Sequence, residues 1–99
     1  MASEVVFHRL VQRDMTRIRR YYSDEAGPEL ADRFYLRFLE LVDRALSDPQ
    51  RYHPVQDVLR RANISGFPYH FLYRETANGI RVLVLRHDKR HPSFGLGRK

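Results

Sequence analysis

The 99-residue sequence contains no cysteine and no tryptophan, and only two of its 18 cationic side chains are lysine. Without cysteine, neither a disulfide framework nor a thiolate zinc site can stabilise the domain. No stretch approaches the roughly 20 apolar residues of a membrane-spanning helix. The N-terminal segment over residues 3–10 is too short and too polar to be the hydrophobic region of a signal peptide. The sequence therefore predicts a cytoplasmic protein with no membrane partner.

A chain of this length predicts one small domain over residues 1–99. Its hydrophobic content of 42% and aromatic content of 12% are sufficient for a core, whereas a disordered basic chain would be poor in both. A domain this small leaves roughly a third or more of its unfolded surface exposed after folding. This excludes an enzyme with a separate cofactor domain, and we expect a shallow site built from few residues.

The positive charge is concentrated in the second half of the chain. Residues 1–50 hold 8 arginines and 9 acidic residues, a net charge of −1, whereas residues 51–99 hold 8 arginines, 2 lysines and 3 acidic residues, a net charge of +7. Sixteen of the cations are arginine, whose planar guanidinium suits phosphate and carboxylate recognition. The pattern indicates nucleic acid or an acidic protein segment as the partner.

Two amphipathic helices are predicted in the first half. The apolar positions of the first helix are Val11, Met15, Ile18 and Tyr22. Their spacing is helical, and Gly27 stands where a helix is expected to end. The second helix is predicted over residues 28–47, with its apolar stripe at Leu30, Ala31, Phe34, Tyr35, Phe38, Leu41, Val42, Ala45 and Leu46. The short connection predicts an antiparallel helical hairpin.

The remaining segments favour strands. We expect them over residues 4–10, 58–65, 67–76 and 80–87, with a loop over 49–56. Asn78-Gly79 predicts a tight turn before the last strand, which is apolar on both faces and should be central in the sheet. The predicted fold is α+β with the order β-α-α-β-β-β, in which a helical hairpin packs on one face of a small, mostly antiparallel sheet.

Several short motifs follow one another along these elements. They are Arg60-Arg61, Gly66-Phe67-Pro68-Tyr69, Tyr73-Arg74, Val82-Leu83-Val84-Leu85 and His87-Asp88-Lys89-Arg90-His91-Pro92. In this order, and over essentially the whole chain, they resemble the RelE/ParE superfamily of toxins from type II toxin-antitoxin systems. The Phe-Pro-Tyr and Arg-His-Pro phrasing is more similar to the ParE branch.

The resemblance implies a protein that arrests growth and is neutralised by an acidic antitoxin protein encoded beside it. ParE-like members poison DNA gyrase, whereas RelE-like members cut mRNA on the ribosome. A third alternative is a nontoxic remnant that only binds its antitoxin.

The nuclease alternative needs groups that transfer protons. Metal-independent RNA cleavage requires a base for the 2′-hydroxyl, an acid for the leaving oxygen and cations for the phosphorane. The candidates for these roles are His70, His87, Arg90 and His91. RelE-like nucleases have an arginine where this chain has His70, and they usually carry a late tyrosine, whereas no tyrosine follows Tyr73 here. We therefore favour a ParE-like toxin that acts by binding and uses no cofactor, with an mRNA endoribonuclease as the alternative.

The predicted target-binding surface is an open, basic sheet face and the strand exit beside it. Its residues are Arg60, Arg61, Arg74, Arg86, Lys89 and Arg90. Because the predicted core elements end near His87, we expect residues 91–99 to be a basic tail. Deletion of this tail should then abolish growth arrest while antitoxin binding persists.

Two further patterns have both a structural and a functional interpretation. His87 and His91 have the spacing of a helical metal site, but they follow a strand, so no metal is expected. Arginines at Arg13, Arg17 and Arg20 form a stripe on the first helix, where like charges cost a few tenths of a kcal/mol per pair, about the size of a favourable pair's gain. The stripe is either a solvated face, balanced by Asp14 and Asp24, or a partner-binding face.

Overall fold

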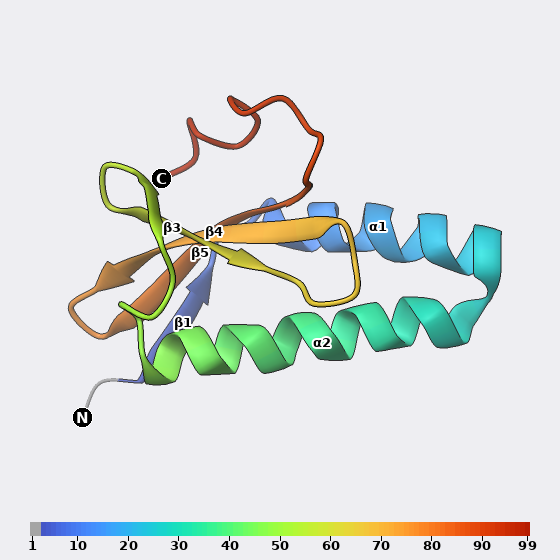
Figure 1. The fold of residues 1–99 in the computed structure, drawn as a ribbon, viewed down its shortest axis with the longest axis horizontal. Helices are drawn as coiled ribbons and strands as arrows, with labels where there is room; N and C mark the ends of the chain where they lie inside the picture. The colour runs from blue at the N-terminus through green and yellow to red at the C-terminus, as the bar shows by residue number, and fades with distance from the viewer. Residues whose placement is uncertain (1–2) are drawn as a thin grey trace.

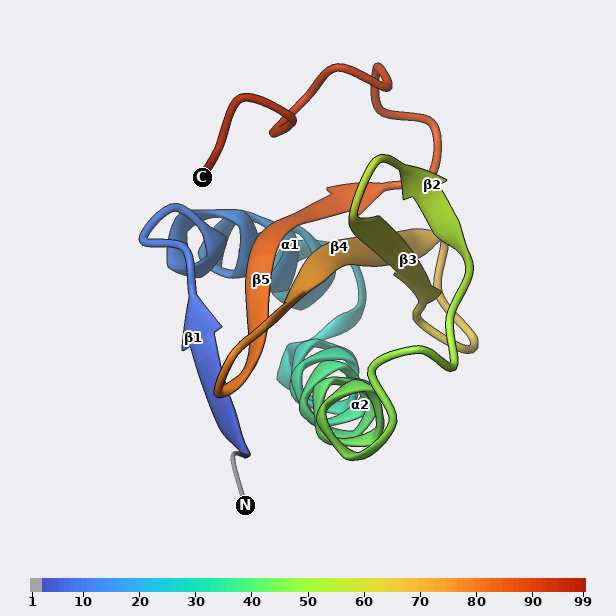
Figure 2. The same ribbon diagram turned by 90° about the vertical axis from the view of Figure 1, so that its left-hand side faces the viewer.

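The computed structural model describes residues 3–99 as two helices packed against a five-stranded sheet (Figure 1, Figure 2). In chain order the elements are β1 (Glu4–Phe7), α1 (Val11–Ala26), α2 (Pro28–Ser47), β2 (Pro54–Gln56), β3 (Leu59–Asn63), β4 (Tyr69–Thr76) and β5 (Gly79–His87). The strand order is β1-β5-β4-β3-β2, with β1 parallel to β5 and all other neighbours antiparallel. The predicted α+β class, the helical hairpin and the interior position of the last strand are confirmed.

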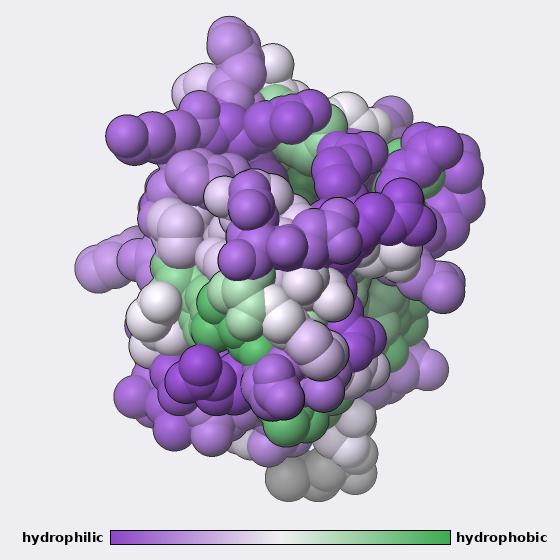
Figure 3. Space-filling view, turned by 90° about the vertical axis from the view of Figure 1, so that its right-hand side faces the viewer, coloured by the Kyte–Doolittle hydropathy of each residue, from purple (hydrophilic) through white to green (hydrophobic). Residues whose placement is uncertain are grey.

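The core lies between the helical hairpin and one face of the sheet. The helix residues of the core are Val11, Met15, Ile18, Phe34, Phe38, Leu41, Val42 and Ala45, and they pack against Ala62, Phe71, Tyr73, Ile80, Val82 and Leu85 of the sheet. The apolar periodicity of both helices therefore faces the sheet as predicted. The end of the molecule at the α1–α2 connection is mostly hydrophilic, with small apolar patches (Figure 3). Within residues 3–99, neither helix is long and apolar enough to cross a membrane.

Gly79 allows the first and last strands to meet. A Cβ at this position would lie 1.9 Å from the Glu4 carbonyl oxygen, and the Glu4 N–H donates to the Asn78 carbonyl over 2.8 Å. The Asn-Gly pair thus makes the predicted turn between β4 and β5 and also permits the close parallel pairing of β1.

The predicted β-α-α-β-β-β order lacked one strand. Residues 54–56, which were expected in a loop, form β2 at the sheet edge. A turn with Asp57 at a φ of 50° then leads into β3, which is shorter than the predicted strand over 58–65. The first strand also ends at Phe7 rather than residue 10, because the His8 imidazole Nδ1 accepts the Leu10 N–H just before α1 begins.

A bulge in β5 shapes the part of the sheet nearest the C-terminus. Tyr73 pairs with Val82 but its neighbour Leu72 pairs with Val84, so Leu83 is an extra residue on β5.

The sheet face opposite the helices is not open there, because the C-terminal segment folds back over it (Figure 2). A Cβ on Gly95 would lie 2.5 Å from a Val84 methyl group. The expectation of an open face with a separable tail over residues 91–99 is therefore wrong.

Candidate functional site

The C-terminal segment is held by a buried ion pair with α1. Arg98 donates two hydrogen bonds to the Asp14 carboxylate, over 2.6 and 3.1 Å, and a third to the Leu83 carbonyl over 3.0 Å. The Asp14 side chain is only 2% exposed and also accepts the Leu85 N–H over 3.1 Å. Because β1 ends at Phe7, this stretch of β5 lacks a neighbouring strand on that side, and Asp14 and Arg98 satisfy its backbone groups instead.

A second polar chain crosses the sheet face beneath this segment. Arg86 Nε donates to His70 Nε2 over 2.9 Å, and His70 Nδ1 lies 2.8 Å from an Asp88 carboxylate oxygen. Arg86 also donates to the carbonyls of Pro92 and Phe94, over 2.7 and 2.8 Å. A guanidinium keeps its protons near neutral pH, so the Nε2 that accepts from it is unprotonated and Nδ1 donates to Asp88. His70 is therefore a neutral bridge between the two charged groups.

This arrangement removes His70 from the candidate catalytic groups. Its side chain is 2% exposed and both ring nitrogens are occupied. Burial is the largest cause that lowers the pKa of His70, and it outweighs the opposing hydrogen bond with Asp88, while Arg61 and Arg86 act in the same direction as burial. A group that reaches neither solvent nor substrate cannot exchange a proton with RNA.

The arginines of β3 also have structural partners. Arg60 donates to the Tyr52 carbonyl over 2.6 Å and to the Gln50 carbonyl over 3.4 Å, and so anchors the chain between α2 and β2. Arg61 lies 3.3 Å from Asp88 and donates to the Asn63 side chain over 2.8 Å. Two members of the predicted target-binding set, Arg60 and Arg61, therefore stabilise loops and the sheet face.

Tyr73 of the Tyr73-Arg74 motif is buried and also has a structural partner. The Tyr73 hydroxyl donates to the Pro49 carbonyl over 2.8 Å, which fixes the chain as it leaves α2. Burial raises the pKa of Tyr73 to about 12, so its phenol remains protonated. Arg74 is half-buried on the same strand, and Lys89 is exposed in the turn after β5.

A groove of about 220 Å³ lies between α1 and the C-terminal segment. Its lining combines the exit of β5 with the exposed side of α1, and the polar groups are Asp14, Arg17, Tyr21, Tyr69, Arg86, His87 and Arg90. Three of these are arginines, and His87 is the one imidazole of the lining. The His87 ring packs edge-on against Tyr69 with centroids 4.9 Å apart, and burial raises the pKa of the Tyr69 phenol.

Arg90 and His91, the other two nuclease candidates after β5, have different contacts. The Arg90 guanidinium stacks over the Phe94 ring at 4.0 Å, which is a cation–π contact. His91 is exposed, accepts the Ser93 N–H and lies 2.8 Å from the Ser93 hydroxyl. Of the four nuclease candidates, only His87 and Arg90 therefore share a groove. Across residues 3–99, no three histidine, aspartate or glutamate side chains come together as metal ligands.

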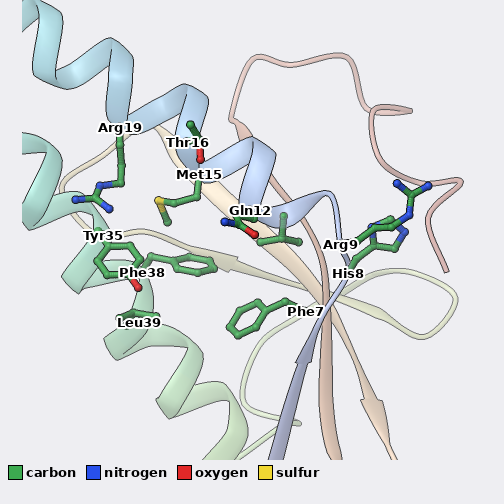
Figure 4. A pocket seen from close by; sticks show the side chains of 11 residues that line it. Phe7, His8, Arg9, Gln12, Met15, Thr16, Arg19, Tyr35, Phe38 and Leu39 are labelled. Atoms are coloured by element: carbon green, nitrogen blue, oxygen red, sulfur yellow. The ribbon is translucent and has the colours of Figure 1, made fainter.

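A larger, apolar groove of about 540 Å³ lies between β1 and the two helices (Figure 4). The apolar lining is Phe7, Val11, Met15, Phe38 and Leu39, together with the Tyr35 ring. Phe7 is 41% exposed and Leu39 is 38% exposed, although both are large apolar residues. The rest of the lining is polar: Arg9 and Arg19 add positive charge, and His8, Gln12 and Thr16 also contribute. Large apolar side chains are thus exposed to solvent beside two cations in this groove.

Sequence reasoning missed the groups that organise this end of the molecule. The sequence predicts Asp14 as a solvated neighbour of the helix arginines, but it lies at about 100° from Arg13 around the helix and is buried. Its partner Arg98 is 84 positions away. A single acidic residue next to the apolar stripe was a signal for a buried partner, but nothing local identified that partner.

Comparison with known proteins agrees with this architecture. A family model described as the ParE toxin of the type II toxin-antitoxin system, parDE, matches residues 5–92. Toxin ParE2 from two strains of Mycobacterium tuberculosis, CDC 1551 / Oshkosh and H37Rv, is 29% identical over 94 residues, which cover 94% of this chain and 89% of that protein. A solved structure described as the chromosomal ParDE TA system from P. aeruginosa has a TM-score of 0.77 at 18% identity, and the match covers 87% of this chain and 96% of that chain.

Proposed function

Because the chain belongs to the ParE toxin family of type II toxin-antitoxin systems, we propose that it arrests growth by binding DNA gyrase and that an acidic antitoxin neutralises it. The working surface is the basic groove between α1 and the C-terminal segment, with Arg90 at its exposed side. The protein needs no cofactor for this action, because inhibition by binding requires only cations and shape.

The observation that supports binding over RNA cleavage is the composition of this groove. It presents the guanidinium groups of Arg17 and Arg90 and a single imidazole, that of His87, whereas Arg86 is already bonded to His70 and to two backbone carbonyls. RNA cleavage requires both a base and an acid, and His70, the other histidine expected from the sheet, is sealed between Arg86 and Asp88. The groove therefore offers two cations that can recognise an anion and one group that can transfer a proton.

A gyrase assay with the purified full-length chain tests this proposal. We expect the chain to inhibit supercoiling of relaxed plasmid and to trap gyrase as cleaved DNA. Arg90→Ala should weaken the inhibition at least about tenfold, which corresponds to about 1.4 kcal/mol. Arg51→Ala, which removes an exposed cation outside the groove, should leave it unchanged. The absence of any effect on gyrase, together with cleavage of mRNA on purified ribosomes, would show that the nuclease alternative is correct.

The antitoxin is best accommodated by the apolar groove of Figure 4. An antitoxin segment would place apolar side chains against Phe7, Phe38 and Leu39 and its carboxylates near Arg9 and Arg19. The outer edge of β1 borders the same surface, because β1 is the first strand of the sheet and pairs on one side only. An extended segment could therefore also add a strand there.

Leu39→Asp tests this assignment, since it places a charge in the groove without touching the buried core. We expect it to weaken the complex with the antitoxin encoded beside the gene at least about tenfold, as measured by titration of the two purified proteins. Val58→Asp is the matched control, because Val58 is 68% exposed and does not line the groove. Equal affinities of the two variants would place the antitoxin elsewhere.

A further inference from the structure

The face of α1 that looks away from the core is a row of arginines. Arg13, Arg17 and Arg20 are exposed and fall within an arc of about 60° around the helix, and Arg9 precedes them just before the helix begins. The opposite face of α1 carries the buried Val11, Met15 and Ile18. The row is therefore carried on a helix that is fixed to the core.

These arginines are not neutralised by the protein. Within residues 3–99, none of the four forms an ion pair, although Arg19 on the flank of the same helix pairs with Asp32 over 2.9 Å. Asp14, the acidic residue within the row in sequence, is turned inward onto Arg98. The predicted balance of the stripe by Asp14 is therefore wrong, and the interpretation as a partner-binding face gains support.

The surface beside the row is shallow and is lined by polar side chains. A shallow groove of about 480 Å³ is lined only by Arg9, Gln12, Arg13, Thr16, Arg17 and Arg20. A protein partner usually contributes buried aromatic or aliphatic anchors at the centre of its interface, and this groove has no apolar side chain to receive them, although Arg9, Gln12 and Thr16 also line the larger groove of Figure 4. Binding to a phosphate backbone is mainly electrostatic and needs no such anchor.

The dimensions of the row fit a run of phosphates. Arg20 follows Arg13 by seven positions, which is about 10 Å along the helix axis. A nucleic-acid duplex presents one phosphate per about 3.4 Å of axis on each strand, so the row spans about three of them. Arg17 also lines the groove that contains Arg90, which extends the basic surface toward the C-terminal segment.

We infer that the arginine face of α1, defined by Arg9, Arg13, Arg17 and Arg20, binds the sugar-phosphate backbone of a nucleic-acid duplex without reading its sequence. This binding goes beyond the proposed inhibition of gyrase and requires no gyrase. Guanidinium groups donate to phosphate oxygens in bidentate geometry, and Gln12 and Thr16 provide neutral donors between them.

The test measures fluorescence anisotropy of a labelled 20-base-pair DNA duplex of arbitrary sequence with the full chain and no other protein. Arg13→Gln/Arg17→Gln/Arg20→Gln is expected to flatten the slope of log K against log salt by about 2.7, from three phosphate contacts at about 0.9 each. When salt rises from about 50 to 200 mM, the affinity of the unaltered chain for the duplex should fall about 40 times more than the affinity of the triple variant. The corresponding triple lysine variant should keep most of the slope.

Arg33→Gln/Arg44→Gln/Arg51→Gln is the charge-matched control, because it removes three exposed arginines that do not line this groove. Far-UV circular dichroism checks that both variants keep their helices. An equal change of slope in the control would show that only net charge matters and would overturn the inference. Retained slope in the α1 variant, or binding of polyglutamate but not of the duplex, would overturn it as well. A duplex RNA of the same length shows whether the surface distinguishes DNA from RNA, and gyrase inhibition is scored in a separate assay.

Discussion

Arg98→Met is expected to lower the free energy of unfolding by about 3 to 5 kcal/mol, the cost of leaving a buried charge without its partner. The substitution keeps a long side chain against the core but removes all three hydrogen bonds to Asp14 and the Leu83 carbonyl. The Asp14 carboxylate would then stay buried with only the Leu85 N–H as a donor. Urea denaturation followed by circular dichroism measures the change.

Two variants separate the ion pair from the loss of tail charge. Lys99→Met removes a neighbouring exposed cation and should change the free energy of unfolding by no more than about 0.5 kcal/mol. Adding Asp14→Asn to Arg98→Met should recover part of the lost stability, because it removes the unpaired charge and keeps an acceptor for the Leu85 N–H. A loss below about 1 kcal/mol for Arg98→Met would show that the pair contributes little to folding.

The same contacts change the expected result of a C-terminal deletion. Removal of residues 91–99 takes away Arg98, the two carbonyl groups that accept from Arg86 and the cover over Val84. A chain truncated in this way should lose antitoxin binding and growth arrest together, since both depend on the fold. Loss of growth arrest in that deletion therefore cannot locate the working surface, whereas the single substitution of Arg90 can.

The elements that follow a local pattern were predictable from the sequence. The periodicity of Phe34, Phe38 and Leu41 and the turn at Gly79 each depend on near neighbours, so the hairpin and the antiparallel strands could be derived. The candidate site was harder to predict from the sequence, because it is organised by contacts between residues that are far apart in the chain. The pairing of Asp14 with Arg98 and the position of His70 between Arg86 and Asp88 depend on how the chain returns over the sheet.

The structure also limits which histidines could act as the base and the acid if this protein cleaved RNA. His70 is buried, whereas His87 lines the basic groove. His91 is the exposed histidine nearest to His87 in sequence. A base or an acid in RNA cleavage is typically worth about 10²- to 10⁴-fold in rate. His87→Gln/His91→Gln would therefore abolish growth arrest if the protein cut RNA, because glutamine does not titrate near neutral pH.

We expect the opposite result, namely that His87→Gln/His91→Gln retains most of its growth arrest when expressed without the antitoxin. A binding toxin uses Arg90 and the neighbouring guanidinium groups, and these are unchanged in the double variant. Arg90→Ala should then be the more harmful substitution, although it alters one side chain instead of two. His53→Gln, which changes an exposed histidine far from β5 in sequence, controls for the loss of an imidazole as such. Cells should show double-strand breaks with the unaltered chain and with the double variant alike. Codon-linked mRNA cleavage that disappears in the double variant would instead assign His87 as the base of an endoribonuclease.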